Sequence, residues 1–558
     1  MEEIKKEKLD KARKIGYLIC PVVLMVIAIC SKGLIYFASD DAMMNNIARG
    51  FFNGKTDEHL IFINVVFGYL TKGLYAITNQ VNWFGVIYIL LILLCVYVIM
   101  NVFKKHSNLL LAFVAGLLIE CLCIYWFTFT VIAYVCVLTG VIKLVDYLTS
   151  KDEKYKTWNV VLVVVLFVFA YVLRDSSFIS GFLVLLPLLI FNFKKIEDKK
   201  KLLVLAPVVI CILCCFVLNK FAYSSNMWKD YTKFNTLRSE VIDHPVSEYK
   251  EAKDFYKSIG YSENDLYCAT HWCFGDKTVF SPKNYKKIIK NTPFSTRYCV
   301  SLKQLWSLRR YYVKFALIFG LSAVALILIA ALTILKGKKL CYILQVLFGI
   351  GFVMVTIFIN KPITRVVIPM LILTMFALVY MYVTDESEKA INFKKYYTRV
   401  VVVVFAVMSV AFIYKTVTNA IELNNRNEKA KEVYAYVKDH ADSLYLCQAK
   451  ERLLYNKPVM EMVGSDICEN VMQTGDQDIY NNCYYDQLNN LGVKKKDTNR
   501  LLMNLINRPK TYLIVDEKEE PKIKEMVNRF LWEHSGKIIS CHDKKSFNNN
   551  IKIYQFTK

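Results

Sequence analysis

Long apolar runs dominate this sequence and limit what it can fold into. Eleven of them approach the roughly 20 residues that an α-helix needs to cross a bilayer. They cover 15–37, 82–103, 107–126, 129–148, 157–173, 178–193, 202–222, 313–335, 340–360, 363–384 and 399–415. Hydrophobic residues make up 55% of the 558 positions, which excludes an ordinary soluble protein. The sequence therefore predicts a polytopic α-helical membrane protein with about 11 transmembrane helices.

One further apolar stretch, 59–78, carries scattered polar residues that suit an interfacial helix as well as a span. The distribution of lysine and arginine decides between the two. With 11 spans and a cytoplasmic N-terminus, every lysine-rich cluster faces the cytoplasm, and counting 59–78 as a span would reverse them all. These clusters are 104–105, 151–156, 194–201, 336–339 and 389–399. We therefore expect 59–78 on the outer membrane surface and an extracytoplasmic C-terminus.

The net charge of +24 resides in those loop clusters, which favours membrane lipids over nucleic acid as the partner. The first apolar run has no small-residue cleavage pattern after it, so it reads as a retained anchor. Cysteines are numerous, 17 in all, but most lie in apolar runs and none shows metal-ligand spacing. A zinc site is therefore not expected, and a disulfide between Cys268 and Cys273 remains open.

Three polar regions fall outside the membrane in this topology. Residues 38–81 form a loop with two surface helices, and 223–312 form a second extracytoplasmic loop. Residues 1–415 thus make the transmembrane domain, and 416–558 make a small extracytoplasmic α/β domain. Its expected elements are helices at 424–440 and 521–532 and strands at 443–447, 512–515, 537–540 and 551–556.

Two adjacent carboxylates, Asp40 and Asp41, follow the first apolar run at the membrane boundary. Carboxylates lose hydration there, so they usually mark a function or an ion pair. One interpretation is structural: Ser39 or Asp40 caps a helix that opens at Asp41. The other is catalytic, with one carboxylate acting as a general base on an acceptor hydroxyl.

The flanking residues bear on that choice. Asp40-Asp41-Ala42 is followed by Ala48-Arg49, by Gly54 and by the His59-led apolar stretch. This layout resembles GT-C-fold glycosyltransferases, integral-membrane enzymes that use polyprenyl-phosphate sugars. The resemblance implies that Asp40 is the catalytic acid-base residue and Asp41 its supporting acid. It also implies substrate contacts near Arg49, and a bacterial cytoplasmic-membrane location. Many members carry another acid between the third and fourth spans, and loop 125–130 here has none.

Four further basic residues are candidates for binding the donor phosphate. A guanidinium forks onto phosphate oxygens, so Arg174 and Arg365 suit this role, and Arg365 with Pro369 resembles a late Arg-x-x-x-Pro element of the family. The alternatives are a local Arg174–Asp175 ion pair and a snorkelling Arg365. Lys55 and His59 are the other two candidates, and His59 could also act as a proton shuttle. Alternatively, Lys55 is a solvated residue of a turn, and His59 is hydrogen-bonded to a neighbouring acid such as Asp57 or Glu58.

The loop from Ser262 to Asp265, with Trp272 and Asp276, carries acids and aromatics suited to sugar contact. Together with Arg238, Asp243 and Gly260, it is similar to a loop in a group of bacterial GT-C-like membrane proteins. The alternative interpretation is a folded cap over the membrane domain.

The sequence thus predicts a membrane glycosyltransferase with Asp40 as general base. It would move a sugar from a polyprenyl-phosphate donor to a cell-envelope glycan or lipid acceptor on the outer face. The alternatives are a non-catalytic GT-C-like scaffold and a lipid or sugar transporter (flippase), although internal repeats are not evident. No cofactor is expected, and a divalent cation, if used, is not expected to bind tightly.

Overall fold

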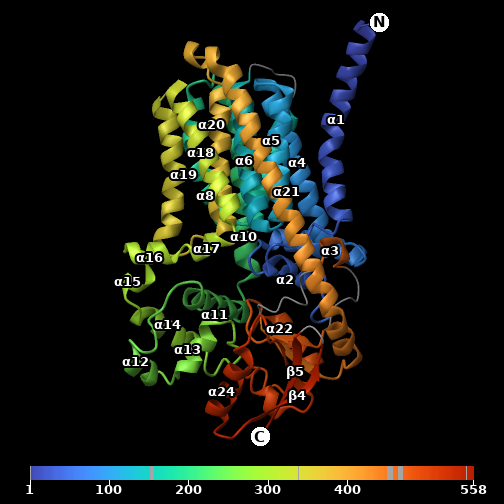
Figure 1. Cartoon of the computed structure of the whole chain (residues 1–558), viewed down its shortest axis with the longest axis vertical. Helices are drawn as coiled ribbons and strands as arrows, with labels where there is room; N and C mark the ends of the chain where they lie inside the picture. Colours follow the sequence, from blue (N-terminus) through green and yellow to red (C-terminus); the bar gives the residue numbers. More distant parts are fainter. Residues whose placement is uncertain (1, 151–155, 337–338, 449–456, 463–468, 548–549) are drawn as a thin grey trace.

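The computed structural model describes residues 2–150, 156–336, 339–448, 457–462, 469–547 and 550–558. A bundle of long helices carries a smaller extramembrane module at one end (Figure 1). The N-terminus lies at the opposite end of the bundle, and the C-terminus lies in the module. The described residues include only part of the predicted lysine clusters 151–156 and 336–339, and the rest of both clusters lies outside them. The predicted orientation of the chain across the membrane remains a prediction.

Each predicted apolar run coincides with a helix or with a bent pair of helices. In the part of the chain that the structure describes, seven helices are long and apolar enough to cross a membrane, or eight if α8 and α9, bent by 47°, form one span. The apolar parts of α1, α5 and α7 complete the predicted set but are shorter. The bundle helices are α1 (Glu2–Cys30), α4 (Trp83–His106), α5 (Leu109–Tyr125), α6 (Phe129–Thr149), α7 (Lys156–Leu173), α8 (Asp175–Val184), α9 (Leu186–Phe193), α10 (Leu205–Ala222), α18 (Ala316–Lys336), α19 (Lys339–Phe358), α20 (Thr364–Val383) and α21 (Glu388–Asp439). The chain is a multi-pass membrane protein, although helix length alone supports fewer spans than the 11 predicted.

Burial separates the central helices from those that face lipid. The most apolar window of α20 is 94% buried and that of α6 is 89% buried, whereas that of α10, with the preceding turn η1 (Lys199–Val204), is only 17% buried. Because lipid solvates apolar side chains, the exposed leucines, isoleucines and valines of α10 need no protein partner. The core of the bundle is therefore built around α6 and α20.

The predicted interfacial stretch 59–78 contains a single helix, α3 (Val65–Ile77). Asn64 begins it by accepting a hydrogen bond from the Val66 amide at 3.0 Å. Thirteen residues rise only about 20 Å, which is too short for a bilayer core. Figure 1 shows α3 near α2 (Ser39–Ala48), at the end of the bundle that meets the module.

The module combines the loop after α10 with the C-terminal region. Its sheet has the order β2-β1-β3-β5-β4, parallel from β2 to β3 and antiparallel from β3 to β4. The strands are β1 (Leu444–Cys447), β2 (Val471–Gln473), β3 (Thr511–Asp516), β4 (Ser540–Ser546) and β5 (Ile551–Thr557). The helical elements are α11 (Asn226–Ile242), α12 (Lys253–Ser258), α13 (Glu263–Thr270), α14 (Pro282–Asn291), α15 (Phe294–Arg297), α16 (Leu302–Ser307), α17 (Arg310–Val313), η3 (Val459–Glu461), α22 (Asn482–Asn490), α23 (Asn504–Asn507) and α24 (Ile523–Ser535).

An α/β domain was expected here, and its strands near 443, 512 and 551 match β1, β3 and β5. The strand predicted at 537–540 is wrong, because β4 only begins at Ser540. The cause is Gly536, which ends α24 in the left-handed conformation with φ of 65°. The residues that follow it connect the helix to the sheet.

One hydrophobic core joins the two regions that the sequence presents as separate. Phe234 of α11 packs against Phe274 and Tyr480, which lie in the loop and in the C-terminal region. Two glycines bring these regions into contact: a Cβ on Gly275 would lie 2.7 Å from the Thr474 oxygen, and one on Gly475 would lie 2.8 Å from the Trp272 oxygen. The loop and the C-terminal region therefore form a single module.

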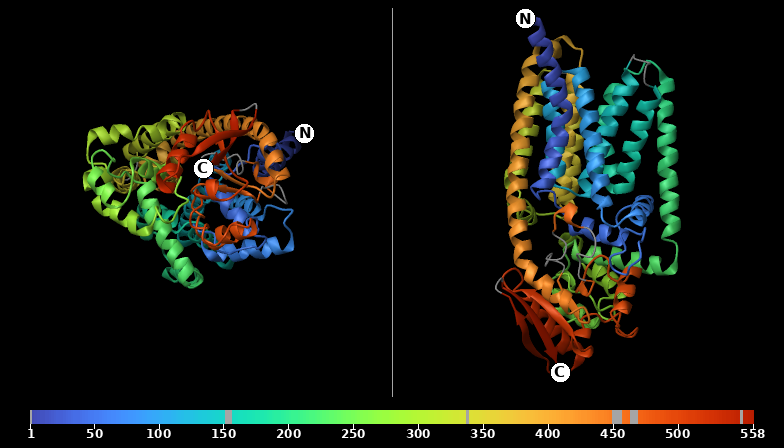
Figure 2. Two further views of the ribbon diagram at one scale, coloured as in Figure 1. Left: turned by 90° about the horizontal axis from the view of Figure 1, so that it is seen from below. Right: turned by 90° about the vertical axis from the view of Figure 1, so that its right-hand side faces the viewer.

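Helix α21 links the bundle to this module without a break. It runs for 52 residues from Glu388 to Asp439, through the predicted domain boundary at 415/416 and through most of the helix predicted at 424–440. Figure 2 shows it descending along the bundle into the module. The connection is a continuous helix and not a linker.

The shared core makes a testable claim about stability. Phe234→Ala removes a fully buried ring and should cost about 3–5 kcal/mol of local stability. Hydrogen exchange measured by mass spectrometry should then accelerate in peptides from both 226–291 and 471–507. The control is Phe294→Ala, because the Phe294 side chain is 60% exposed. This variant should leave hydrogen exchange unchanged in both groups of peptides. Acceleration confined to the first set would contradict the single core.

Candidate active site

A cavity of about 710 Å³ lies where the bundle meets the module. The bundle contributes α2, the start of α8, the end of α10 and the start of α20, while the module contributes α11 and the segments around Trp272 and Gln477. Its charged lining residues are Asp40, Arg174, Lys220, Arg238, Asp243, Lys361, Arg365 and Asp476. Three of the seven residues that the sequence selects as site residues therefore meet here: Asp40, Arg174 and Arg365.

Asp40 lies in the first turn of α2 and faces this cavity. Ala38 is the residue that begins the helix, and no side chain caps it, so the predicted capping role of Ser39 or Asp40 is wrong. Arg365 instead donates a hydrogen bond from Nη2 to Asp40 Oδ2 at 3.2 Å, and Gln477 donates from Nε2 to Oδ1 at 3.0 Å. The bundle and the module both hold this carboxylate.

Asp41 points away from the cavity into the end of the bundle and is fully buried. Its Oδ1 accepts hydrogen bonds from the Tyr88 hydroxyl at 3.0 Å and the Phe129 amide at 2.9 Å. Burial raises the pKa of Asp41 from 3.8 to about 7. The two neighbouring acids are thus separated: Asp40 faces the cavity, and Asp41 connects α2 to α4 and to the first residue of α6.

Arg174 projects between the bundle and the cavity as the residue before α8. It donates hydrogen bonds to Thr130 Oγ1 at 3.0 Å and Ser176 Oγ at 3.2 Å, and its guanidinium lies 5.1 Å from the centre of the Phe129 ring. No ion pair to Asp175 forms among the described residues, so the predicted local pair is absent. Burial, and next the charge of Arg365, lower the pKa of Arg174.

Arg49 and Lys55 lie outside the cavity. Arg49 is buried and donates a hydrogen bond to the Met462 carbonyl at 3.0 Å, which ties α2 to the module. Lys55 is exposed at the turn after α2. Arg49 thus has a structural role here, and the geometry gives Lys55 no contact with the other candidates.

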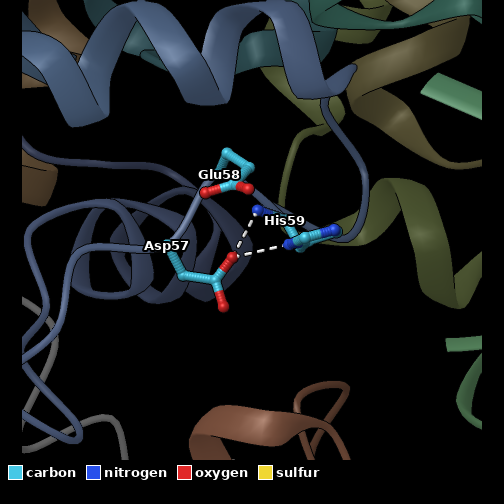
Figure 3. Close-up of side chains that lie close together, drawn as sticks. All are labelled: Asp57, Glu58 and His59. Atoms are coloured by element: carbon cyan, nitrogen blue, oxygen red, sulfur yellow. Dashed lines mark hydrogen bonds and ion pairs between the residues drawn. The ribbon is translucent and has the colours of Figure 1, made fainter. Parts of the chain in front are cut away.

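His59 lies behind the cavity wall, beside Asp57 and Glu58 (Figure 3). Its Nδ1 lies 2.7 Å from Asp57 Oδ1 and its Nε2 lies 3.2 Å from the Ala222 carbonyl oxygen. Both partners are acceptors, so both ring nitrogens donate. Burial lowers the pKa of His59, but its bonds to Asp57 and Ala222 outweigh burial and raise it. This matches the predicted histidine satisfied by a neighbouring acid.

Among the described residues, two groups of side chains have the spacing of metal ligands: Asp57 with Glu58 and His59, and Asp265 with Glu533 and His534. In the first, hydrogen bonds to Asp57 and to the Ala222 carbonyl already occupy both ring nitrogens of His59. In the second, His534 Nε2 lies 2.7 Å from Asp265 Oδ1, which ties α13 to α24. Hydrogen bonds within the protein account for both groups. That no metal binds tightly remains a prediction.

Several cavity residues were not selected from the sequence as site residues. Gln477 and Asp476 follow β2, more than 400 residues after Asp40, in a stretch without a recognisable motif. Lys361, which pairs with Asp243 at 2.7 Å, and Lys220, at the end of α10, read as ordinary interfacial lysines. The sequence did point to three module residues of the cavity: Trp272, as an aromatic suited to sugar contact, and Arg238 and Asp243, through the likeness to the bacterial loop.

The cavity is electropositive, since five cationic and three acidic side chains line it. Two of the cations and two of the acids form ion pairs with each other: Arg365 with Asp40, and Lys361 with Asp243. Burial, followed by the charge of Asp478, raises the pKa of Asp476, which favours the neutral form of this third acid. Three cations, Arg174, Lys220 and Arg238, have no ion-pair partner within the described ranges. The site is suited to anions.

Comparisons with known proteins give one similarity. No protein-family model and no curated protein matches the chain. Among solved structures, ArnT from Cupriavidus metallidurans bound to undecaprenyl phosphate matches with a TM-score of 0.39 and 10% identity. The apo structure of the same protein gives a TM-score of 0.40 and 10% identity. Each match covers 97% of this chain and 98% of the other.

The burial of Asp41 predicts a pH-dependent stability. Its pKa rises from 3.8 to about 7 on folding, so its contribution is complete below pH 3.8 and is lost as pH rises through 7. Asp41→Asn keeps the acceptor for Phe129 and removes this dependence. Its thermal midpoint should therefore exceed the wild-type value by more at pH 8 than at pH 5.

Thermal unfolding of the purified protein in detergent, followed by intrinsic fluorescence, measures this difference. Asp254→Asn, on the exposed face of α12, serves as the matched control. Its thermal midpoint should differ from that of the wild type by the same small amount at pH 5 and at pH 8. A difference for Asp41→Asn that stays constant from pH 5 to pH 8 would contradict the burial argument.

Proposed function

We propose that this protein is a membrane glycosyltransferase of the GT-C type that takes its sugar from a polyprenyl-phosphate donor. The acceptor is a hydroxyl of a cell-envelope glycan or lipid, and transfer occurs on the outer face of the membrane. The observation that carries the proposal is the cavity at the end of the bundle, where Asp40 shares the lining with Arg174 and Lys220, two cations that have no ion-pair partner among the described residues. That combination supplies a base and an anion site next to lipid.

Asp40 is the general base of this reaction. The acceptor hydroxyl attacks the anomeric carbon, its proton passes to the Asp40 carboxylate, and the bond from that carbon to the phosphate oxygen breaks. The product has the inverted configuration because one displacement occurs, and the transition state resembles an oxocarbenium ion. Gln477 keeps the carboxylate oriented toward the cavity through its bond to Oδ1.

The departing polyprenyl phosphate needs positive charge around its oxygens. Arg174 and Arg365 lie close enough that each affects the other electrostatically, and both line the cavity. When a phosphate enters, Arg365 shares its donors between that anion and Asp40, since a guanidinium carries five N–H groups. Electrostatic stabilisation of a leaving group in this way is often the largest single contribution to catalysis.

The lipid chain of the donor and the acceptor approach from different sides. Asn219 and Lys220 place the end of α10 in the cavity wall, and α10 is mostly exposed along the bundle. A polyprenyl chain therefore lies along α10 with its phosphate at the cavity. The acceptor enters from the side of the module, whose α11 and Gln477 form the opposite wall.

Transfer itself is the decisive measurement. Purified protein incubated with labelled polyprenyl-phosphate sugars and cell-envelope acceptors should transfer the label, and Asp40→Asn should lower kcat by about 10²–10⁴-fold. Asp254→Asn is the control and should keep wild-type activity. Full transfer by Asp40→Asn would exclude Asp40 as the base. Transfer from no donor would favour a scaffold or a transporter.

The proposed sidedness is testable on intact cells. A membrane-impermeant maleimide should label Lys537→Cys, which is exposed in the module, without permeabilisation. Lys200→Cys, exposed at a lysine cluster of the bundle, should react only after permeabilisation. The unsubstituted protein gives the background from its own cysteines. Labelling in the reverse order would place the cavity on the cytoplasmic side.

A further inference from the structure

The half of the cavity formed by the module contains a buried arginine whose charge the protein does not neutralise. Arg238 of α11 is 2% exposed and lines the cavity. Its Nε and Nη2 donate to Asn235 Oδ1, at 3.0 Å and 2.6 Å, while Nη1 has no hydrogen-bond partner within the described ranges. An unpaired buried charge costs several kcal/mol, so it is usually retained for a ligand.

The surroundings of Arg238 hold its guanidinium in place but do not balance it. Its central carbon lies 5.1 Å from the centre of the Trp272 ring and 5.8 Å from that of Phe274. Trp272 has a φ of 58°, a conformation that non-glycine residues rarely adopt and that is frequent at ligand clamps. Asp476 lies near enough to affect Arg238 electrostatically, yet the two form no ion pair among the described residues.

We propose that this half of the cavity binds an acidic sugar, with Arg238 as the cation that pairs with its carboxylate and Trp272 as the wall against its ring. The inference rests on the proposed function and extends it by naming the class of sugar. Arg174 and Lys220 lie on the bundle side and serve the donor phosphate, so Arg238 is available for a second anion. Asp476 lines the same half of the cavity, and in its neutral form, which burial favours, it donates a hydrogen bond to the same sugar.

Binding of free monosaccharides to the full chain tests the proposal without requiring catalysis. Saturation-transfer NMR with glucuronate and with glucose at pH 7 should give a Kd about tenfold lower for glucuronate. Arg238→Gln should abolish this preference, and Arg238→Lys should keep part of it. The matched control is Arg309→Gln, because Arg309 is exposed and lies 4.6 Å from the centre of the Trp306 ring, outside the cavity.

Equal affinity of the wild type for both sugars, or a preference that survives Arg238→Gln, would overturn the proposal. Tighter binding of glucose 6-phosphate than of glucuronate would also overturn it, by assigning the site to phosphorylated sugars. These outcomes are separate from the transfer assay. A protein that transfers sugar but lacks the preference refutes only this inference, whereas one that transfers from no donor refutes the proposed function.

A second variant covers the case in which Arg238→Gln does not fold. The groups that act on Asp476 are Asp478 beside it, Asp40 from α2 and Arg238 from α11. Burial raises the pKa of both Asp476 and Asp478, and the charge of Asp478 raises that of Asp476 further, so ionisation of this pair at higher pH places negative charge close to Arg238. The wild type should lose most of its preference for glucuronate between pH 7 and pH 9. Asp476→Asn should keep it, and an equal loss in both would contradict the assignment.

The transfer assay then shows which substrate carries the acidic sugar. If Arg238→Gln raises the KM of a glucuronate donor and not that of a glucose donor, the acidic sugar belongs to the donor. If it changes neither donor but raises the KM of an acidic acceptor, the sugar belongs to the acceptor. A variant with no change in any KM would contradict the proposed site.

Discussion

The hydrogen bonds to Asp40 join parts of the chain that are far apart in sequence. Arg365 comes from the start of α20, and Gln477 comes from the module 437 residues after Asp40. The two contacts exist together only if the bundle, α2 and the module have all folded and docked. A carboxylate at a membrane boundary is unfavourable unless it is paired. Asp40 has both of these partners only when the bundle and the module take up this relative position, so its charge favours that position.

The same junction divides the charges of the cavity into two groups. On the bundle side, Arg174 and Lys220 lie next to the exposed helix α10, within reach of a lipid-borne anion. On the module side, Arg238 lies among aromatic rings, and Asp476, whose pKa burial raises, lies nearby. The two anion sites proposed above fit a reaction in which one substrate is lipid-linked and the other is not.

The sequence predicted those parts of the structure that depend on local composition. Apolar runs located the bundle helices, and the acids and arginines at membrane boundaries located Asp40, Arg174 and Arg365. Gln477 and Asp476 were out of reach, because their place in the cavity depends on how the module docks. Arg49 is the opposite case: the sequence motif predicted a substrate contact for it, but in the structure it donates a hydrogen bond to the Met462 carbonyl. Helix length also fell short of the predicted 11 spans, since α1, α5 and α7 have short apolar parts.

The unbroken course of α21 has a geometric consequence for the site. Because an α-helix turns about 100° per residue, one residue inserted into α21 between the bundle and β1 would rotate the module about that axis. Gln477 would then swing away from Asp40, whereas an insertion of seven residues would nearly restore the angle but shift the module by about 10 Å. The number of residues in α21 therefore fixes both the angle and the height at which the module meets Asp40.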